Sequence, residues 1–273
     1  MLAAAAAVAT AATLPAFVTL RAQTGPPSLN YSILPGLGGK APLKREPWNG
    51  YLAVGGGNPS SWFHVLGPLG GCSNASGNLS KTSVTAKAHK CRYAVNGGPF
   101  SMSTGACIGR NIADGIDVCP SCEPRLGASF GLGMNGTTWV VGDFNETSIH
   151  TLGLTQLISG FNWLVRDGHV VGRPGGEVAP RTALGVTSDG RLVILEVDGC
   201  EGCPKVIGGP KGFDMYSLAK KMHSLGCVHA INLDGGGSSA TAIDGKLADW
   251  PTDKHIPIGF PQERAVSTIV CVT

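Results

Sequence analysis

The residues from Ile231 to Ser239 read Ile-Asn-Leu-Asp-Gly-Gly-Gly-Ser-Ser, which joins an extended run to an acid, three glycines and two hydroxyls. Alternation along a strand directs Asn232 and Asp234 to the same face. Glycines directly after a strand let the backbone turn sharply, and successive backbone N–H groups in such a turn bind anions. A carboxylate beside an anion-binding turn suits a reaction that separates a cationic centre from an anionic leaving group. A tight turn without a ligand is the alternative, and we favour the site.

Three other polar residues stand at the ends of expected strands. Asp198 closes a strand over residues 191–198 directly before a glycine, as Asp234 does. Arg181 opens the neighbouring strand, and a surface ion pair is the alternative role for it. Asn96 precedes two further glycines, and its amide both donates and accepts hydrogen bonds, which suits a sugar hydroxyl or acetamido group. An ordinary turn is the alternative for Asn96.

Many short apolar runs separated by turn residues indicate a chain dominated by β-structure. Asn-Gly and Asp-Gly pairs predict hairpin turns between neighbouring strands. Apolar residues spaced three, four and three apart predict one clear helix over residues 214–225, capped by Asp214 and Gly226. The expected hairpins turn at residues 135–136, 167–168, 189–190 and 244–245, two short helices are expected at 81–89 and 155–159, and a last strand at 265–272.

The overall composition excludes several classes of protein. The chain has 273 residues, enough for one large domain or two small ones with a real core. A net charge of +3 without a basic stripe gives no support for a nucleic-acid partner. The sequence also contains no nucleotide-binding P-loop, no metalloprotease His-Glu-x-x-His motif and no Gly-x-Ser-x-Gly hydrolase motif.

The amino-terminal residues are apolar, rich in alanine and end at Arg21, which is typical of a secretory leader. We expect a signal peptide over residues 1–22, and a membrane anchor is the alternative. Residues 23–50, rich in proline and glycine, are expected to form an extension that wraps the domain or stays loose. The catalytic domain is expected over residues 51–273, with no stable membrane insertion apart from the leader.

The cysteines indicate an oxidising compartment, and their odd number leaves at least one free or paired between chains. Four of the cysteines form two Cys-x-x-Cys pairs, Cys119-Pro-Ser-Cys122 and Cys200-Glu-Gly-Cys203. Such pairs bind zinc, carry out redox chemistry or form ordinary disulfides. Both pairs lie in turn-like sequence, so we favour disulfides. The secretory lumen or the exterior of the cell is the expected location. Asn-x-Ser/Thr sequons, which fit this location, begin at Asn30, Asn74, Asn78, Asn135 and Asn145.

These motifs occur in an order that resembles the phosphodiester glycosidase family. The resemblance covers about residues 62–272, and its most specific block contains Asp234. It implies an α+β fold of a single domain, with a mixed, mostly antiparallel β-sheet core and a few flanking helices. The matching stretches are Asn96-Gly97-Gly98-Pro99-Phe100, Asn162-Trp163-Leu164-Val165-Arg166, Arg181-Thr182-Ala183-Leu184-Gly185, Val197-Asp198-Gly199, Asn232 to Ser239 and Arg264-Ala265-Val266-Ser267.

The resemblance implies a substrate in which N-acetylglucosamine is α-linked through phosphate to mannose on a glycoprotein, and a product that exposes mannose 6-phosphate. Cleaving the sugar C1–O bond forms an oxocarbenium-like centre. The phosphate is already a good leaving group, so it needs positive charge and N–H donors more than protonation. Asp234 and Asp198 are expected to flank the bond, and Arg181 to bind the phosphate. The other residues expected to bind substrate are Asn96, Gly97, Gly98, Thr182, Gly235, Gly236, Gly237, Ser238 and Arg264, with a structural salt bridge as the alternative for Arg264.

We expect no cofactor, and no spacing of ligands demands a metal, although two carboxylates would permit one. Two other functions stay open at this point. One is a hydrolase of the same family that acts on another glycosyl phosphodiester or on a surface polymer. The other is a glycan- or phosphate-binding protein without turnover. The sequence also leaves open the oligomeric state, and whether the sugar retains or inverts its configuration.

Overall fold

The largest sheet of the computed structural model has seven strands, and Arg181, Asp198 and Asp234 lie at one end of its central strands. The structure describes residues 16–40, 47–67, 71–72, 78–120, 122, 127–205, 208–254 and 260–273. Across the sheet the strands follow the order β13 (His169–Val170), β12 (Asn162–Arg166), β16 (Cys227–Asn232), β14 (Arg181–Thr187), β15 (Leu192–Val197), β3 (Trp48–Gly56) and β2 (Ser28–Gly39).

Two further sheets and a two-stranded ribbon of β19 (Ala265–Val266) and β5 (Ser80–Lys81) complete the β-structure of the described residues. The five-stranded sheet has the order β18 (Lys246–Leu247), β17 (Thr241–Ile243), β6 (Tyr93–Asn96), β20 (Ile269–Val272) and β4 (Phe63–Leu66). The six-stranded sheet has the order β1 (Phe17–Arg21), β10 (Thr138–Gly142), β9 (Ser129–Gly133), β11 (Gln156–Ser159), β7 (Ile112–Ala113) and β8 (Ile116–Asp117).

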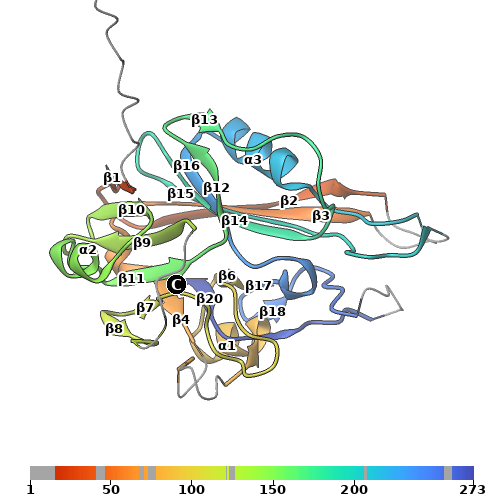
Figure 1. The fold of residues 1–273 in the computed structure, drawn as a ribbon, viewed down its shortest axis with the longest axis horizontal. Coiled ribbons are helices and arrows are strands. Elements are labelled where there is room, and N and C mark those ends of the chain that lie inside the picture. Colours follow the sequence, from red (N-terminus) through yellow and green to blue (C-terminus); the bar gives the residue numbers. More distant parts are fainter. Residues whose placement is uncertain are drawn as a thin grey trace, which may run out of the picture.

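Few helices accompany the sheets. The described residues contain three α-helices, α1 (Thr82–Ala88), α2 (Glu146–Thr151) and α3 (Met215–Ser224), and 3₁₀ turns that include Pro59–Ser61 and Gly236–Ser238. Figure 1 shows α3 on one face of the seven-stranded sheet and the five-stranded sheet, with α1, beyond the other face. The expected α+β fold of one domain with a mostly antiparallel core is therefore confirmed.

The seven-stranded sheet is buried on both faces, and the alternation of β15 divides its side chains between two cores. Val193, Leu195 and Val197 pack with Leu218 and Met222 of α3. The other face of β15 enters the core shared with the remaining sheets, which contains Leu192, Ile194, Phe63, Phe130 and Trp139. A polar residue at the end of β15 is therefore enclosed by protein whichever face it takes.

The expected helix and hairpins are largely confirmed. Helix α3 begins after Asp214, whose side chain accepts a hydrogen bond from the N–H of Ser217 (2.6 Å), and it is followed by Gly226 at φ +87°. The four expected hairpins are β9–β10, β12–β13, β14–β15 and β17–β18. Asp167 and Asp244 have φ of +49° and +50°, the left-handed conformation that Asp-Gly turns adopt.

Several local expectations were wrong. Residues 156–159 form the strand β11 rather than a helix, because they pair with β9 on one side and β7 on the other. The last strand divides into β19 and β20, and α2 was not expected.

Residues 23–50 were expected to wrap the domain or to stay loose. Within them, residues 28–39 form β2, which pairs with β3 at the edge of the sheet. Residues 17–21 of the expected leader form β1, paired with β10, whereas residues 1–15 lie outside the described residues.

The cysteines form four disulfides, Cys72–Cys107, Cys91–Cys271, Cys119–Cys122 and Cys200–Cys203, and Cys227 is free and buried. The preference for disulfides at the two Cys-x-x-Cys pairs is confirmed. Burial raises the pKa of the Cys227 thiol to about 12, so this cysteine is shielded and unreactive in the native protein.

Removing the disulfide that joins the segment between α1 and β6 to the strand β20 is expected to destabilise the fold most among the four. Cys91 and Cys271 are 180 residues apart, so the Cys91→Ala/Cys271→Ala pair should lower the free energy of unfolding by about 3–5 kcal/mol. The matched control is Cys119→Ala/Cys122→Ala, which opens a loop of separation 3 and should cost about 2 kcal/mol. Urea unfolding measures both values, and equal losses would contradict the loop-length argument.

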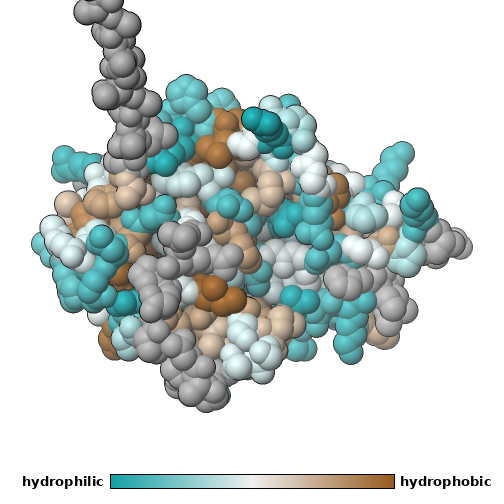
Figure 2. Space-filling view, in the orientation of Figure 1, coloured by the Kyte–Doolittle hydropathy of each residue, from teal (hydrophilic) through white to brown (hydrophobic). Residues whose placement is uncertain are grey.

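The exposed surface is mixed in character. On the face shown in Figure 2, hydrophobic residues form separate small groups between hydrophilic ones. Asn30, Asn78, Asn135 and Asn145 are exposed, and Asn74 lies outside the described residues. No helix in the described part of the chain combines the length and the apolar character needed to cross a membrane.

Candidate active site

Arg181 and Asp234 lie at the same end of two central strands of the seven-stranded sheet, because the antiparallel strand β14 begins where β16 ends. The two strands are antiparallel, with Ala183 opposite Asn232. Arg181 lies opposite Val197, whose side chain faces α3. Asp234 has the same parity as Asn232, whereas Ile231 and Leu233 face the opposite core. The side chains of Arg181 and Asp234 therefore lie on the α3 side of the sheet.

A cavity of about 400 Å³ opens at this end of the strands. It brings together one arginine, three acids, two asparagines and a small apolar wall. Its lining consists of Phe161, Asn162, Glu177, Ala179, Arg181, Glu201, Met215, Asn232, Asp234, Gly235 and Gly236. A concave site with a few converging charged groups is the usual form of a small-molecule binding site.

Arg181 is held in the cavity wall by backbone carbonyls. Its Nε donates to the carbonyl of Phe213 (3.1 Å) and its Nη2 to that of Glu177 (2.8 Å). Burial lowers the pKa of the guanidinium, against the attraction of nearby acids that include Glu201 and Asp234. The pKa of arginine is so high that the group keeps its charge. The site therefore contains a fixed cation whose remaining N–H groups are able to bind an anion.

Asp234 is fixed through its backbone, while its carboxylate contacts the glycine turn. Its N–H donates to the carbonyl of Gly97 (3.1 Å), and its Oδ1 accepts from the N–H of Gly235 (3.0 Å). Burial raises the pKa of Asp234, whereas hydrogen bonds from Ser238 and Gly235 and the charge of Arg264 lower it. Burial is the largest of these effects, so the carboxyl group binds a proton more strongly than an exposed aspartate does.

The three glycines after Asp234 lie against close neighbours, and two of these neighbours are charged side chains. A Cβ on Gly235 would lie 2.9 Å from the carbonyl oxygen of Pro180, and a Cβ on Gly236 would overlap the Glu201 carboxylate. A Cβ on Gly237 would overlap the guanidinium of Arg264. Gly236 also has φ of +59°, which side chains disfavour. Gly236 and Gly237 thus allow two charged groups, Glu201 and Arg264, to approach one turn.

Most of the amides that were expected to bind an anion are hydrogen-bonded within the protein in this conformation. The N–H groups of Gly236, Ser238 and Ser239 donate to the carbonyls of Pro180 (2.9 Å), Gly235 (3.1 Å) and Gly236 (3.2 Å). The N–H of Gly235 is used by Asp234. The turn is a short 3₁₀ segment, which bonds its own amides internally. The positive charge of the site therefore comes from arginine.

Asn96 and Thr182 were expected to touch substrate, but both side chains are buried and hydrogen-bonded within the protein. Asn96 Nδ2 donates to the backbone carbonyl of Asp234 (2.8 Å), and Thr182 Oγ1 donates to Asn96 Oδ1 (2.6 Å). Gly97 and Gly98 are also buried, and a Cβ on either would overlap the backbone of Thr268 or Ser159. These residues position Asp234 and pack strand ends together, because their side of the sheet faces the core.

Asp198 does not share the cavity with Asp234. Arg181 is opposite Val197, so the next residue points to the other face of the sheet. Asp198 is 2 % exposed and accepts hydrogen bonds from the N–H groups of Asn49 (3.4 Å) and Trp250 (3.0 Å). The two faces of β15 were predicted correctly. Asp198 and Asp234 were expected to flank the same substrate bond, but the pairing of β14 with β15 places them on opposite faces of the sheet.

Arg264 makes the ion pair that was its alternative role. Its Nε bonds to Asp253, and its Nη1 donates to Ser238 Oγ (3.1 Å). Ser238 is buried and in turn bonds to Asp234. Arg264 does not line the cavity, so it acts on Asp234 through the serine and through its charge.

Seven lining residues were not predicted from the sequence, and three of them, Glu201, Glu177 and Asn232, bear most on the chemistry. Glu201 stands between Cys200 and Cys203, and the sequence pattern there drew attention to the cysteines as metal ligands or disulfide partners and not to the acid. Glu177 lies in a loop before β14, where no pattern distinguished it. Asn232 was assigned to the face of Asp234 but not to the site. Asn232 is 3 % exposed, and its Oδ1 has no hydrogen-bond partner among the described residues. A buried, unpartnered acceptor at a cavity wall suits a ligand that donates a hydrogen bond.

A second cavity of about 360 Å³ adjoins the first and shares Asn162 and Met215 with it. Its other lining residues are Trp163, Leu164, Val171 and Gly172, so its wall is mostly apolar. The two cavities together offer a charged compartment beside an apolar one.

Adding a methyl group at Gly236 should disturb this site more than the fold. In Gly236→Ala the Cβ meets the flexible end of Glu201, so the carboxylate of Glu201 must move from its place in the cavity wall. Gly153→Ala is the matched control, because Gly153 has a similar φ of +53° but nothing within 4 Å of its Cβ. Both variants should lose about 1 kcal/mol of stability from backbone strain. Only Gly236→Ala should bind substrate analogues at least tenfold more weakly, measured by calorimetry. Equal binding by the two variants would contradict a role for Glu201.

Comparison with known proteins matches residues 89–273 to a family described as phosphodiester glycosidase. The chain is 32 % identical over 235 residues to the mouse N-acetylglucosamine-1-phosphodiester alpha-N-acetylglucosaminidase, covering 79 % of this chain and 44 % of the mouse protein. The human protein of the same name is 31 % identical, covering 78 % and 44 %. The chain therefore spans less than half the length of these relatives.

A solved structure supports the same relationship. The catalytic domain of the zebrafish N-acetylglucosamine-1-phosphodiester alpha-N-acetylglucosaminidase, described as auto-inhibited by its pro-peptide, superposes with a TM-score of 0.77. It is 29 % identical in sequence, and the match covers 94 % of this chain and 88 % of that one.

Proposed function

The chain belongs to the phosphodiester glycosidase family, and from this we propose that it hydrolyses the bond between C1 of α-linked N-acetylglucosamine and the phosphate of a phosphodiester. The products are free N-acetylglucosamine and a phosphate monoester. On glycoproteins this reaction exposes mannose 6-phosphate. The names of the mouse and human relatives describe hydrolysis of this kind of substrate.

The observation that carries this proposal is the meeting of a guanidinium and a carboxylate in one cavity. Arg181 and Asp234 both line the cavity, and the carboxylate of Asp234 attracts the guanidinium of Arg181 electrostatically. A glycosyl phosphodiester needs these two groups, because a positive charge develops at C1 while a negative charge is released onto phosphate. A neutral sugar ligand would need neither charge.

In the proposed reaction the C1–O bond breaks, and its electron pair goes to the phosphate oxygen. Arg181 binds the phosphate and stabilises the charge that it gains. Asp234 stabilises the positive charge at C1 and takes a proton from the water that forms the new C1–O bond. That proton then passes to solvent, so the site returns to its initial state.

The other lining residues suit the sugar. Glu177 and Glu201 are acceptors for sugar hydroxyls, and the unpartnered Oδ1 of Asn232 is an acceptor for a hydroxyl or the acetamido N–H. The apolar cavity beside Trp163 and Met215 suits the methyl of the acetamido group.

We further propose that the protein works in the lumen of the secretory pathway or outside the cell. Four disulfides support this location, since disulfides persist where the environment is oxidising.

The decisive assay measures release of N-acetylglucosamine from methyl 6-(α-N-acetylglucosaminyl-phospho)-mannoside. Uridine diphosphate N-acetylglucosamine and a glycosyl-phosphate polymer serve as alternative substrates. Release from the mannoside is the expected result. If the protein cleaves only the uridine diphosphate sugar or the polymer, it is a hydrolase of the same family with a different substrate. If it binds all three compounds and releases no sugar, it is a glycan-binding protein.

A further inference from the structure

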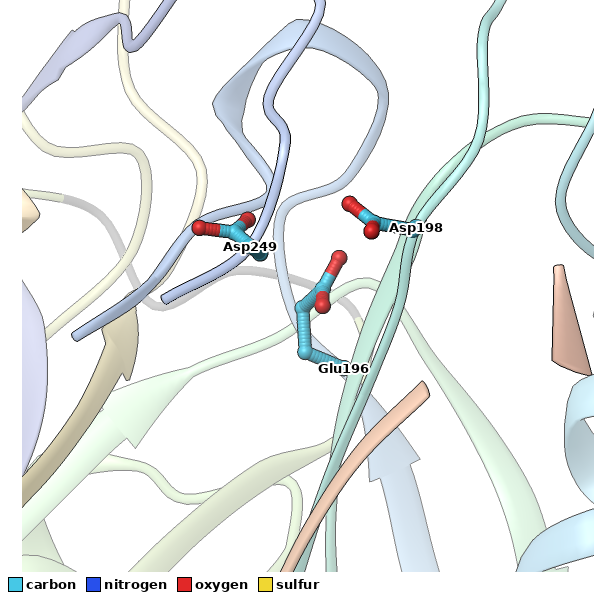
Figure 3. A group of neighbouring side chains, drawn as sticks. All are labelled: Glu196, Asp198 and Asp249. Carbon is cyan, nitrogen blue, oxygen red and sulfur yellow. The ribbon is translucent and has the colours of Figure 1, made fainter. Parts of the chain in front are cut away.

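Three buried acids outside the proposed active site face one another across a small gap. Glu196 and Asp198 stand at the end of β15, and Asp249 lies in the segment after β18 (Figure 3). One oxygen from each carboxyl group lies within 4.8 Å of the others. Glu196 is opposite Thr182 in the strand ladder, so the group lies on the face of the sheet away from the cavity of Arg181 and Asp234.

Two of these carboxyl groups, those of Glu196 and Asp249, are buried without a hydrogen bond of normal geometry. Glu196 is 0 % exposed and Asp249 is 6 % exposed, and among the described residues Thr241 alone acts as a neighbouring donor to both. The described groups that act on them electrostatically are other acids, with no lysine or arginine among them. Burial of an unpaired carboxylate is strongly unfavourable, so the arrangement requires a counter-charge or a proton.

A neutral oxygen outside the acidic group points to a cation. The hydroxyl of Thr241, on β17, is fully buried and makes no hydrogen bond that meets normal geometry. It lies close enough to act on Glu196, and the Thr241 backbone acts likewise on Asp249. A central ion would satisfy the acids and the hydroxyl together.

We propose that Glu196, Asp198 and Asp249, with the hydroxyl of Thr241, bind a calcium ion. All four residues offer hard oxygen ligands, which calcium prefers and zinc does not. Two oxygens on opposite sides of a calcium ion are about 4.8 Å apart, because each bond is about 2.4 Å long. The spread of the carboxyl oxygens lies within that limit. Backbone carbonyls and water complete the coordination.

This ion would hold the strand end to the segment that supports the active site. Asp198 accepts a hydrogen bond from the N–H of Trp250, and Thr252 Oγ1 donates to the carbonyl of Gly199 (2.9 Å). The same segment continues to Asp253, which pairs with Arg264 beside the glycine turn. The proposed calcium is structural, and the proposal does not depend on the reaction assigned above.

The test begins with the wild-type protein purified without chelator. Elemental analysis should find about one calcium per chain. After chelation, terbium should bind with a luminescence excited through the nearby Trp250. The melting temperature should be about 5–10 °C higher in excess calcium than in chelator. A metal-free protein with equal melting temperatures and no terbium signal would overturn the proposal, and this result requires no variant.

A pair of variants locates the site. Glu196→Gln removes one charged ligand and should weaken terbium binding at least tenfold and abolish the calcium-dependent shift. Asp244→Asn is the matched control, because Asp244 is an exposed acid in a turn whose left-handed φ of +50° asparagine tolerates. This control should behave as wild type. Unchanged terbium affinity in Glu196→Gln would also overturn the proposal.

Discussion

Asp234→Asn is expected to lower kcat by about 10³-fold or more while the protein stays folded. The substitution keeps the size of the side chain and removes the charge that balances the developing cation at C1. Initial rates of N-acetylglucosamine release measure the effect. Asp244→Asn, the exposed counterpart, should keep its rate within about twofold of wild type, since surface changes have small effects. Residual activity above about a tenth of wild type would remove Asp234 from the mechanism.

The stability of this variant follows from the direction of the pKa shift. Burial raises the pKa of Asp234 above 3.8 in the folded state. The folded protein therefore binds a proton more strongly than the unfolded chain does, so stability falls as the pH rises from 3.8 through the raised pKa. Above that range the ionised carboxylate is unfavourable. Asp234→Asn should accordingly melt at the same temperature as wild type or higher at neutral pH, which separates lost chemistry from lost folding.

Arg181→Ala is expected to lower kcat/KM for the phosphodiester by about 10²–10³-fold, because its guanidinium stabilises the departing phosphate. The comparison substrate is 4-nitrophenyl α-N-acetylglucosaminide, whose leaving group has no phosphate. On this substrate the loss should be less than about tenfold. Arg181→Lys should recover little, since lysine lacks the planar pair of donors.

The control for this experiment is Arg191→Ala. Arg191 is an exposed arginine that pairs with Asp189 in a turn, so its removal should leave both rates within about twofold of wild type. Equal losses on the two substrates in Arg181→Ala would show that Arg181 supports the loop of Glu177 and Phe213, to which it donates, and not the phosphate.

The parts of the fold that were predictable from the sequence are those specified by local chemistry. Asp-Gly and Asn-Gly pairs specify their own turns, and a capped amphipathic segment specifies α3. Strand β11 was read as a helix because its pairing with β9 and β7 depends on partners far away in sequence. Strand β2 was missed because an edge strand with prolines and glycines lacks the alternation of a buried one.

The site was predictable only where one strand carried the information. Arg181 and Asp234 open and follow neighbouring antiparallel strands, so their closeness follows from the pairing. Asp198 also ends a strand, but the face that it takes depends on the register between β14 and β15. Glu201 reaches the cavity through a turn whose position no local pattern specifies. Polar residues at strand ends can therefore be identified as candidate site residues from the sequence. Which of them share one cavity depends on the register between the strands.

The Cys200–Cys203 disulfide has a practical consequence for anyone who produces this protein. Glu201 stands inside the bridged turn, and no other disulfide includes a residue of that turn. Molecules that lack this bridge but keep the other three would have complete sheets and a normal circular dichroism spectrum, yet Glu201 would be poorly held at the wall of the cavity. Specific activity per folded molecule would then vary between expression hosts, and free thiol content would report the defective fraction.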